Sequence, residues 1–243
     1  MMRALRAELR KLLTVRSTYV VLIIVLGLTA AVSFWASGYK ADGVLGSYHW
    51  QNAMLATITG VSFFVGITPI LLITHEYRHN LIYYTLTGIR SRSSVFWAKV
   101  AVSALYSLIF FTLVLIVTTA ALAAGLRFGG HTLPPQHVIW WPLLWHGGFY
   151  LLAITLLAVI FAFIIRNQIG AFVAYLLYPG TAENLLGLLL KKNIGYLPFT
   201  AISNVFDHSS PDFSVHKSAV IASTWLVAGL VASWLLFLRR DAN

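Results

Sequence analysis

Six long apolar runs decide what this chain can fold into. They cover residues 18–37, 52–74, 98–125, 147–165, 168–190 and 217–238. A helix needs about 20 apolar residues to cross the hydrocarbon core of a membrane, and backbone in lipid must satisfy its own hydrogen bonds. Charged residues make up only 10% of the chain, against about 25% in a typical soluble domain. The sequence therefore predicts an all-α integral membrane protein with six transmembrane helices, forming a single domain over residues 1–243.

The fifth run is the least regular of the six. Tyr178-Pro179-Gly180 interrupts it, and Glu183 follows. A proline removes a backbone donor and clashes with the preceding turn, so we expect a kink or break near Pro179. Two roles stay open for Glu183: a polar group of an outer gate beside the substrate path, or a cap for the N–H groups of residues 181–190.

Residues 2–16 form a basic amphipathic segment before the first run. Leu5, Leu9 and Leu12 recur at helical spacing, while the basic residues lie largely on the other side. Such a helix lies in the headgroup plane of a membrane. We therefore expect an interfacial elbow helix over 2–16 that contacts anionic lipid through Arg3, Arg6, Arg10 and Lys11. The alternative, a signal peptide, is disfavoured because the following run is long enough to span a membrane.

The basic residues also predict how the chain is oriented. With the N-terminus in the cytoplasm, most of the 17 Lys and Arg residues lie on the cytoplasmic side, as the positive-inside rule requires. Both termini are then cytoplasmic, and 191–216 is an outer region with short re-entrant helices. Because the basic residues flank apolar runs, they indicate membrane topology, and we expect no nucleic-acid partner.

The polar stretch between the second and third runs contains a formal zinc-peptidase motif. His75-Glu76-Tyr77-Arg78-His79 has the form H-E-x-x-H, in which two histidines share a helix face and Glu76 could act as a general base. A catalytic zinc also needs a third protein ligand, and the acidic residues are poorly placed to supply one. A membrane-embedded zinc metalloprotease using His75, Glu76 and His79 is therefore the alternative, and our first expectation is that the chain has no metal site.

The same stretch carries a second pattern. It contains Glu76-Tyr77-Arg78, then Leu86, Arg90 and Arg92, and Lys99 opens the next run. This pattern resembles the first cytoplasmic loop of ABC-2-type transporter permeases, in which a span ends in a Glu-Tyr/Phe-Arg-x-Gly-Thr signature. The sequence departs from that signature at Asn80, Leu81 and Ile89. Two further segments resemble the family in order along the chain: Glu8-Leu9-Arg10-Lys11-Leu12 with Arg16 and Ser17, and Glu183-Asn184-Leu185-Leu186 with Leu197-Pro198-Phe199.

This resemblance implies the membrane subunit of an ATP-driven exporter. The chain has no G-x-x-x-x-G-K-[ST] string and thus no P-loop ATP site of its own. It would be a transport subunit and not an enzyme, without a cofactor, in the bacterial cytoplasmic membrane. ATP and Mg would be bound by a separate P-loop ATPase, present in two copies beside a second permease of the same or similar sequence. The small outer loops favour a hydrophobic or amphipathic substrate, such as a drug, an antimicrobial peptide or a lipid.

The resemblance also implies two groups of site residues. A coupling loop over 76–97 would bind the ATPase through Glu76, Tyr77, Arg78, Leu81, Tyr83, Tyr84 and Arg90. The translocation path or gate would include Phe34, Phe63, Phe64, Tyr175, Tyr178 and Glu183. For each single aromatic residue, ordinary packing or lipid contact is the competing interpretation.

Overall fold

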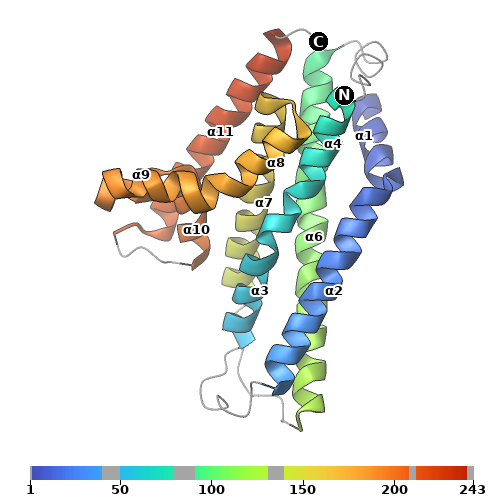
Figure 1. Cartoon of the computed structure of the whole chain (residues 1–243), viewed down its shortest axis with the longest axis vertical. Helices are drawn as coiled ribbons and strands as arrows, with labels where there is room; N and C mark the ends of the chain where they lie inside the picture. Colours follow the sequence, from blue (N-terminus) through green and yellow to red (C-terminus); the bar gives the residue numbers. More distant parts are fainter. Residues whose placement is uncertain (1, 40–49, 79–90, 131–139, 208–211, 240–243) are drawn as a thin grey trace.

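The structure, a computed structural model, describes residues 2–39, 50–78, 91–130, 140–207 and 212–239. Within these ranges every regular element is a helix (Figure 1). Six helical segments are long and apolar enough to cross a membrane. The chain is thus a helical, multi-pass membrane protein, as the apolar runs predict.

The longest helices form an elongated bundle. α2 (Arg16–Tyr39) runs beside α6 (Arg92–Phe128), and α7 (Trp140–Ile165) lies between α6 and α11 (Val215–Arg239) (Figure 1). α6 begins at Ser91, whose side chain accepts a hydrogen bond from the Ser94 backbone N–H. Because α6 is apolar on all sides, it buries residues against several neighbours and forms the centre of the bundle.

The second apolar run is bent in the middle. It consists of α3 (Trp50–Val65) and α4 (Ile67–Arg78), which meet at Gly66. A Cβ atom at Gly66 would collide with the Tyr175 ring, so this close approach requires glycine. The Tyr175 hydroxyl donates toward the carbonyls of Ser62, at 3.3 Å, and Phe63, at 3.1 Å, beside the bend. Since Tyr175 comes from the fifth run, that run holds the bend in place.

The fifth run is broken, as predicted at Pro179. α8 (Gln168–Leu177) ends in a π-helical turn, Tyr178–Ala182, and α9 (Glu183–Leu190) follows. α9 turns across the bundle axis and projects from its side (Figure 1). The run over 168–190 is therefore divided into two helices that point in different directions. Two short helices lie in the expected region 191–216: η3 (Lys191–Tyr196) and α10 (Pro198–Asp207).

One end of the bundle gathers elements from the whole sequence, and we call it the basic end. α1 (Met2–Thr14), the end of α4, the start of α6 and the end of α11 all lie there (Figure 1). The α7–α8 turn belongs to it as well, because Arg166 in that turn donates to the Leu236 carbonyl of α11. Arg166 has a positive φ of 57°, an uncommon conformation for a residue other than glycine.

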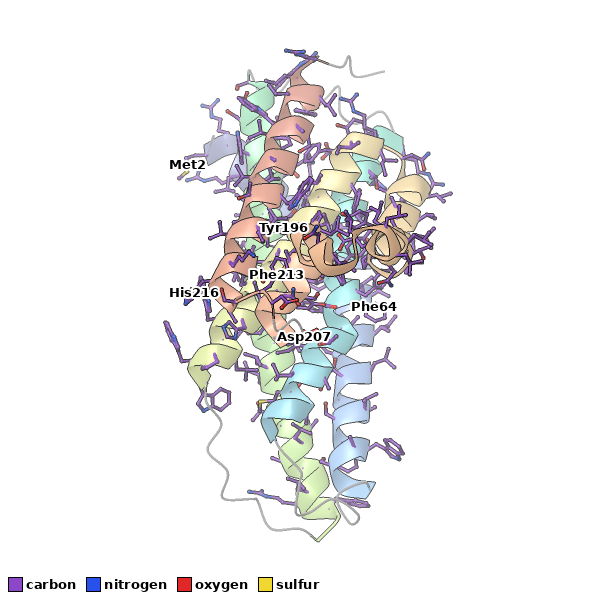
Figure 2. The ribbon with its side chains drawn as sticks, turned by 90° about the vertical axis from the view of Figure 1, so that its left-hand side faces the viewer. Met2, Phe64, Tyr196, Asp207, Phe213 and His216 are labelled. Carbon is purple, nitrogen blue, oxygen red and sulfur yellow. The ribbon has the colours of Figure 1, made fainter. Side chains whose placement is uncertain are left out.

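The helix α1 buries a different face from the one its leucines predict. Ala4, Glu8 and Leu12 are buried, whereas Met2 is 68% exposed and lies at the edge of the molecule (Figure 2). Leu5 and Leu9 are only partly buried. The buried face packs against α6 and carries a glutamate, because that glutamate finds cationic partners there.

Candidate functional site

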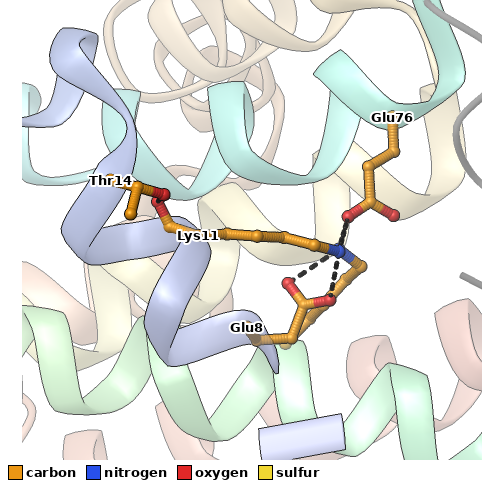
Figure 3. A network of polar contacts seen from close by, with 5 residues as sticks. Glu8, Lys11, Thr14 and Glu76 are labelled. Carbon is orange, nitrogen blue, oxygen red and sulfur yellow. Dashed lines mark hydrogen bonds and ion pairs between the residues drawn. The ribbon is translucent and has the colours of Figure 1, made fainter. Parts of the chain in front are cut away.

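Four charged side chains from three helices meet at the basic end. Glu8 and Lys11 come from α1, Glu76 from α4 and Lys99 from α6 (Figure 3). The Lys99 Nζ atom lies 3.0 Å from Glu8 Oε2 and 2.7 Å from Glu76 Oε1. The Lys11 Nζ atom lies 2.9 Å from Glu8 Oε1 and 2.6 Å from Glu76 Oε1. Two carboxylates and two ammonium groups give a cluster without net formal charge.

Three members of this buried charge cluster are shielded from solvent. Glu8 and Lys99 are fully buried, and Glu76 is 4% exposed. An unpaired buried charge is very costly, so each of these groups depends on the others. Glu76 Oε2 has no hydrogen-bond partner within the described residues. Lys11 is the one member of the cluster that is partly exposed, with 34% of its side chain accessible.

The charge state of Lys11 follows from its neighbours. Burial acts to lower the pKa of the Lys11 ammonium, but the carboxylates of Glu8 and Glu76 outweigh burial and raise that pKa above its ordinary value of 10.5. The stabilisation from a raised lysine pKa is fully present below the ordinary pKa and is lost only as the pH rises through the higher value. The Lys11 ammonium therefore stays charged at neutral pH.

The cluster joins both ends of the segment that we predicted to be the coupling loop. Glu76 lies in the last turn of α4, the helix before residues 79–90, and Lys99 lies in the third turn of α6, the helix after them. The Glu76–Lys99 contact thus ties the two helices that flank this segment. Because Glu8 and Lys11 bind the same two residues, α1 is attached to both helices. A displacement of the loop would therefore move three elements together.

A second contact extends from the same turn of α4. The side chain of Tyr77 faces the α7–α8 turn, where the Arg166 guanidinium carbon lies 5.3 Å from the centre of the Tyr77 ring. Consecutive residues on a helix point about 100° apart, so Glu76 and Tyr77 contact different neighbours. The end of α4 is therefore fastened on two sides, to α1 and α6 through Glu76 and to the α7–α8 turn through Tyr77.

The predicted coupling residues that the structure describes differ in their exposure, and therefore in whether they could contact a partner. Glu76 points into the protein, so its carboxylate positions helices and is not presented to a partner. Arg78 is exposed, which suits contact with a partner. Tyr77 is mostly buried against Arg166. The remaining predicted coupling residues lie outside the described residues: Leu81, Tyr83, Tyr84 and Arg90.

The predicted lipid contacts divide in the same way. Arg3, Arg6 and Arg10 are exposed on α1, as contact with lipid headgroups requires. Lys11 differs from them, because its ammonium pairs with two carboxylates inside the cluster. The physical reason is that a long lysine side chain on the rim of a helix reaches buried carboxylates as easily as headgroups.

The predicted path residues lie in several parts of the bundle. Tyr175 is 1% exposed and wedged against the bend at Gly66, and Phe63 stacks on it with ring centres 5.1 Å apart. Both residues therefore make packing contacts within the bundle. Tyr178 packs against Phe161 at 5.3 Å.

Two other predicted path residues lie on α2 and α3. Phe34 packs against Phe128 of α6, with ring centres 5.5 Å apart. Phe64, labelled in Figure 2, lines a groove between α2 and α3. Among the predicted path aromatics, Phe64 is therefore the one that borders this groove.

Glu183 caps a helix, although not the one we expected. Its side chain is 1% exposed, and its oxygens accept the backbone N–H of Phe199 at 2.6 Å and of Thr200 at 2.8 Å. The Thr200 hydroxyl also donates to it, at 2.8 Å. These donors belong to the first turn of α10, so the expectation of a cap within 181–190 is wrong. A glutamate at a helix N-terminus satisfies unpaired N–H groups and complements the helix dipole.

The zinc-peptidase alternative gains no support from these positions. His79 lies outside the described residues, and within them no group of three His, Asp or Glu side chains could hold a metal ion. His75 is exposed, whereas the Glu76 carboxylate is buried between two lysine ammonium groups. A carboxylate held in this way is poorly placed to act as a base for a metal-bound water.

The pairing of Glu8 with Lys99 was not anticipated from the sequence. Both residues belong to the motifs that resemble the family, but 91 positions separate them. One signal could have suggested the contact. Lys99 lies among Val95, Phe96 and Val100 on an apolar helix, and a cation in that environment needs an acidic partner.

A scan against models of known protein families found no model that matches this chain, and a search of curated proteins found no matching relative. The functional interpretation therefore rests on the sequence patterns and on the geometry described above.

Proposed function

We propose that this chain is the permease subunit of an ATP-driven ABC exporter, with a separate P-loop ATPase bound at the basic end. The observation that carries the proposal is the buried charge cluster, which ties both flanks of residues 79–90 to each other and to α1. The resemblance of the same segment to the first cytoplasmic loop of ABC-2-type permeases also supports it.

In this proposal the coupling loop receives movement from the ATPase. Closure of the ATPase on ATP pushes the loop, and the Glu76–Lys99 contact makes α4 and α6 respond together. α1 follows, because Glu8 and Lys11 hold the same two residues. Below the cluster, the bend at Gly66 separates α4 from α3, so a movement of α4 changes the angle between the two halves of the span. A cavity between the two permeases would then alternate between inward and outward openings.

Each group of residues has a separate task in this mechanism. Tyr83, Tyr84 and Leu81 supply apolar contact with the ATPase, and Arg78 and Arg90 orient it through charge. Charged contacts of this kind favour specificity and association rate more than affinity. The buried charge cluster holds α1, α4 and α6 in fixed positions relative to one another. Because removing one partner of a buried ion pair is destabilising, the three helices move as a unit.

The complex would contain two permeases and two ATPases, in the cytoplasmic membrane of a bacterium, with the basic end in the cytoplasm. A positive-inside distribution of charge supports this orientation. The substrate would be a hydrophobic or amphipathic molecule, because the short connections at the opposite end leave no room for a large domain that captures a polar substrate outside.

Purification of the tagged chain from its native host in mild detergent, followed by mass spectrometry, tests the proposal. A P-loop ATPase in stoichiometric amount is the expected result. Changing Tyr83 and Tyr84 together to Asp should release it. Trp141→Asp is the matched control, since Trp141 is 78% exposed and lies in the first turn of α7, at the other end of that helix from the α7–α8 turn of the basic end. Release by the control variant would show that aromatic-to-acid changes act nonspecifically.

A second variant separates docking from transmission. Glu76→Gln should leave the ATPase bound, because Glu76 is buried, but it should reduce substrate-stimulated ATP hydrolysis. If Glu76→Gln releases the ATPase as completely as the tyrosine variant, Glu76 contacts the partner directly and the positioning role is wrong. A chain that purifies alone with bound zinc, which is lost in His79→Ala, would replace the exporter with the metalloprotease.

A further inference from the structure

A groove of about 290 Å³ lies between α2 and α3, with Leu122 of α6 as part of its floor. Its lining is almost entirely apolar and includes several small residues, among them Gly60 of α3. On each helix the lining residues recur every three or four positions, so they lie on one face of that helix. The groove is therefore formed where two helix faces with small side chains lie opposite each other without filling the space between them.

The length of the groove matches one leaflet of a membrane. On α2 its lining residues extend from Val25 to Ala36, a rise of about 16 Å at 1.5 Å per residue. Half of a typical hydrocarbon core is about 15 Å. This part of α2 is the half away from the basic end. The groove thus runs from mid-membrane toward the opposite surface, which is the path of an acyl chain in that leaflet.

One hydroxyl in the lining is left without a partner. Thr29 donates to the Val25 carbonyl at 2.7 Å, and Thr57 donates to the Ala53 carbonyl at 2.8 Å. Ser33 is 2% exposed, and its hydroxyl has no hydrogen-bond partner within the described residues. A buried hydroxyl without a partner in an apolar environment is unfavourable, so an acceptor in the groove would stabilise it.

We propose that this groove is a lipid-binding site that holds one acyl chain of a membrane phospholipid. The chain lies against α2, α3 and Leu122, and the ester carbonyl accepts a hydrogen bond from Ser33. Ser33 lies three residues, or about 4.5 Å along the helix, from Ala36 at the surface end of the groove. The ester carbonyl of a lipid lies beside its glycerol, near the membrane surface, so it would lie within reach of Ser33. This site is independent of the proposed ATPase coupling, which takes place at the opposite end of the bundle.

Gly60 offers a direct way to fill the groove. A Cβ atom at Gly60 would meet no atom within 4 Å, so Gly60→Leu can place its side chain in the groove without a collision near the backbone. Gly27 provides a matched control. It also faces open space, but it lies roughly 200° around α2 from Val25, on the face away from the groove.

The experiment uses the full chain, stripped of lipid by detergent exchange and titrated with dioleoyl phosphatidylglycerol under native mass spectrometry. In the titration, the wild type and Gly27→Leu should each bind one lipid tightly per chain. Gly60→Leu should lose that lipid, with an apparent Kd at least tenfold higher. Ser33→Ala should weaken binding by about 3- to 10-fold, the range expected for one hydrogen bond.

Three results would overturn the proposal. A wild-type chain that retains no lipid has no such site, and equal retention by Gly60→Leu and Gly27→Leu would place the lipid elsewhere. If Gly60→Leu keeps its lipid but changes the oligomeric state, the groove is covered by a second copy of the chain. A thermal unfolding curve for each variant identifies loss of lipid through misfolding, and in that case the smaller change Ser33→Ala decides.

Discussion

At the scale of single residues, Lys99 combines a location that disfavours charge with partners that make the charge tolerable. It is fully buried on an apolar helix, and two carboxylates contact its ammonium at 3.0 and 2.7 Å. The two carboxylates come from α1 and α4, far from Lys99 in sequence. The contacts of Lys99 therefore fix the positions of α1 and α4 relative to α6.

We expect Lys99→Met to be strongly destabilising and a second substitution to offset part of the loss. Lys99→Met leaves Glu8 and Glu76 to share Lys11, and removing one partner of a buried pair costs about 3–5 kcal/mol. Adding Glu8→Gln restores a cluster without net charge. Thermal unfolding in detergent should place the double variant above Lys99→Met. A double variant that is less stable than Lys99→Met would show that charge balance is not what holds the cluster.

Glu183 provides a second prediction at this scale. Glu183→Ala removes the acceptor of three hydrogen bonds at the start of α10, and the loss of a helix cap costs about 0.5–2 kcal/mol. Glu183→Gln keeps one oxygen and should cost less. Thr200→Val removes only the hydroxyl donor and serves as the control. Unfolding temperatures measured for the purified variants should fall in the order Thr200→Val, Glu183→Gln, Glu183→Ala. If transport is lost in Glu183→Gln while the unfolding temperature is unchanged, Glu183 acts in a gate and not only as a cap.

At the scale of helices, the sequence predicts the second span but not the bend within it. The apolar run over 52–74 predicts the span, and the structure has helix from Trp50 to Arg78. The bend at Gly66 was not anticipated, because it depends on Tyr175, which lies more than 100 positions away. The break at Pro179 was anticipated, because proline disrupts a helix through local geometry alone.

Gly66→Ala tests whether the bend depends on the contact with Tyr175. The added methyl group would overlap the Tyr175 ring and lie 2.9 Å from the Ala158 side chain, and overpacking of this kind costs about 1–3 kcal/mol. Gly60→Ala is the matched control on α3, where the methyl group meets open space and should be neutral or slightly stabilising. A Gly66→Ala protein that unfolds at the temperature of Gly60→Ala would contradict a tightly packed bend.

At the scale of the whole molecule, composition and hydropathy predict most of what the fold requires. They predict a helical membrane protein with six apolar segments, because a bilayer admits few alternatives for such a chain. They do not predict which charged residues meet. The contacts of Glu8 with Lys99 and of Glu183 with α10 join distant segments, and only the packed helices bring them together.

The orientation of the whole chain can be measured with single cysteines, because the sequence contains none. Met2→Cys marks the basic end and Asp212→Cys the connection before α11, and both positions are exposed. With a membrane-impermeant maleimide, we expect Asp212→Cys to react in intact cells and Met2→Cys to react only after the cells are opened. Reaction of Met2→Cys in intact cells would place the basic end outside and reverse the proposed topology.

The buried charge cluster also has a consequence for biogenesis. A chain emerges from the ribosome with its N-terminus first, so Glu8, Lys11 and Glu76 are made before Lys99. Until α6 enters the membrane, α1 lacks its fully buried cationic partner and can stay at the membrane surface. Docking of α1 is therefore a late event, and it reports that the first three spans have been inserted in the right order. In a chain that inserts them wrongly, Glu8 and Glu76 would have to share Lys11, and the N-terminal helix would lose one of its two attachments.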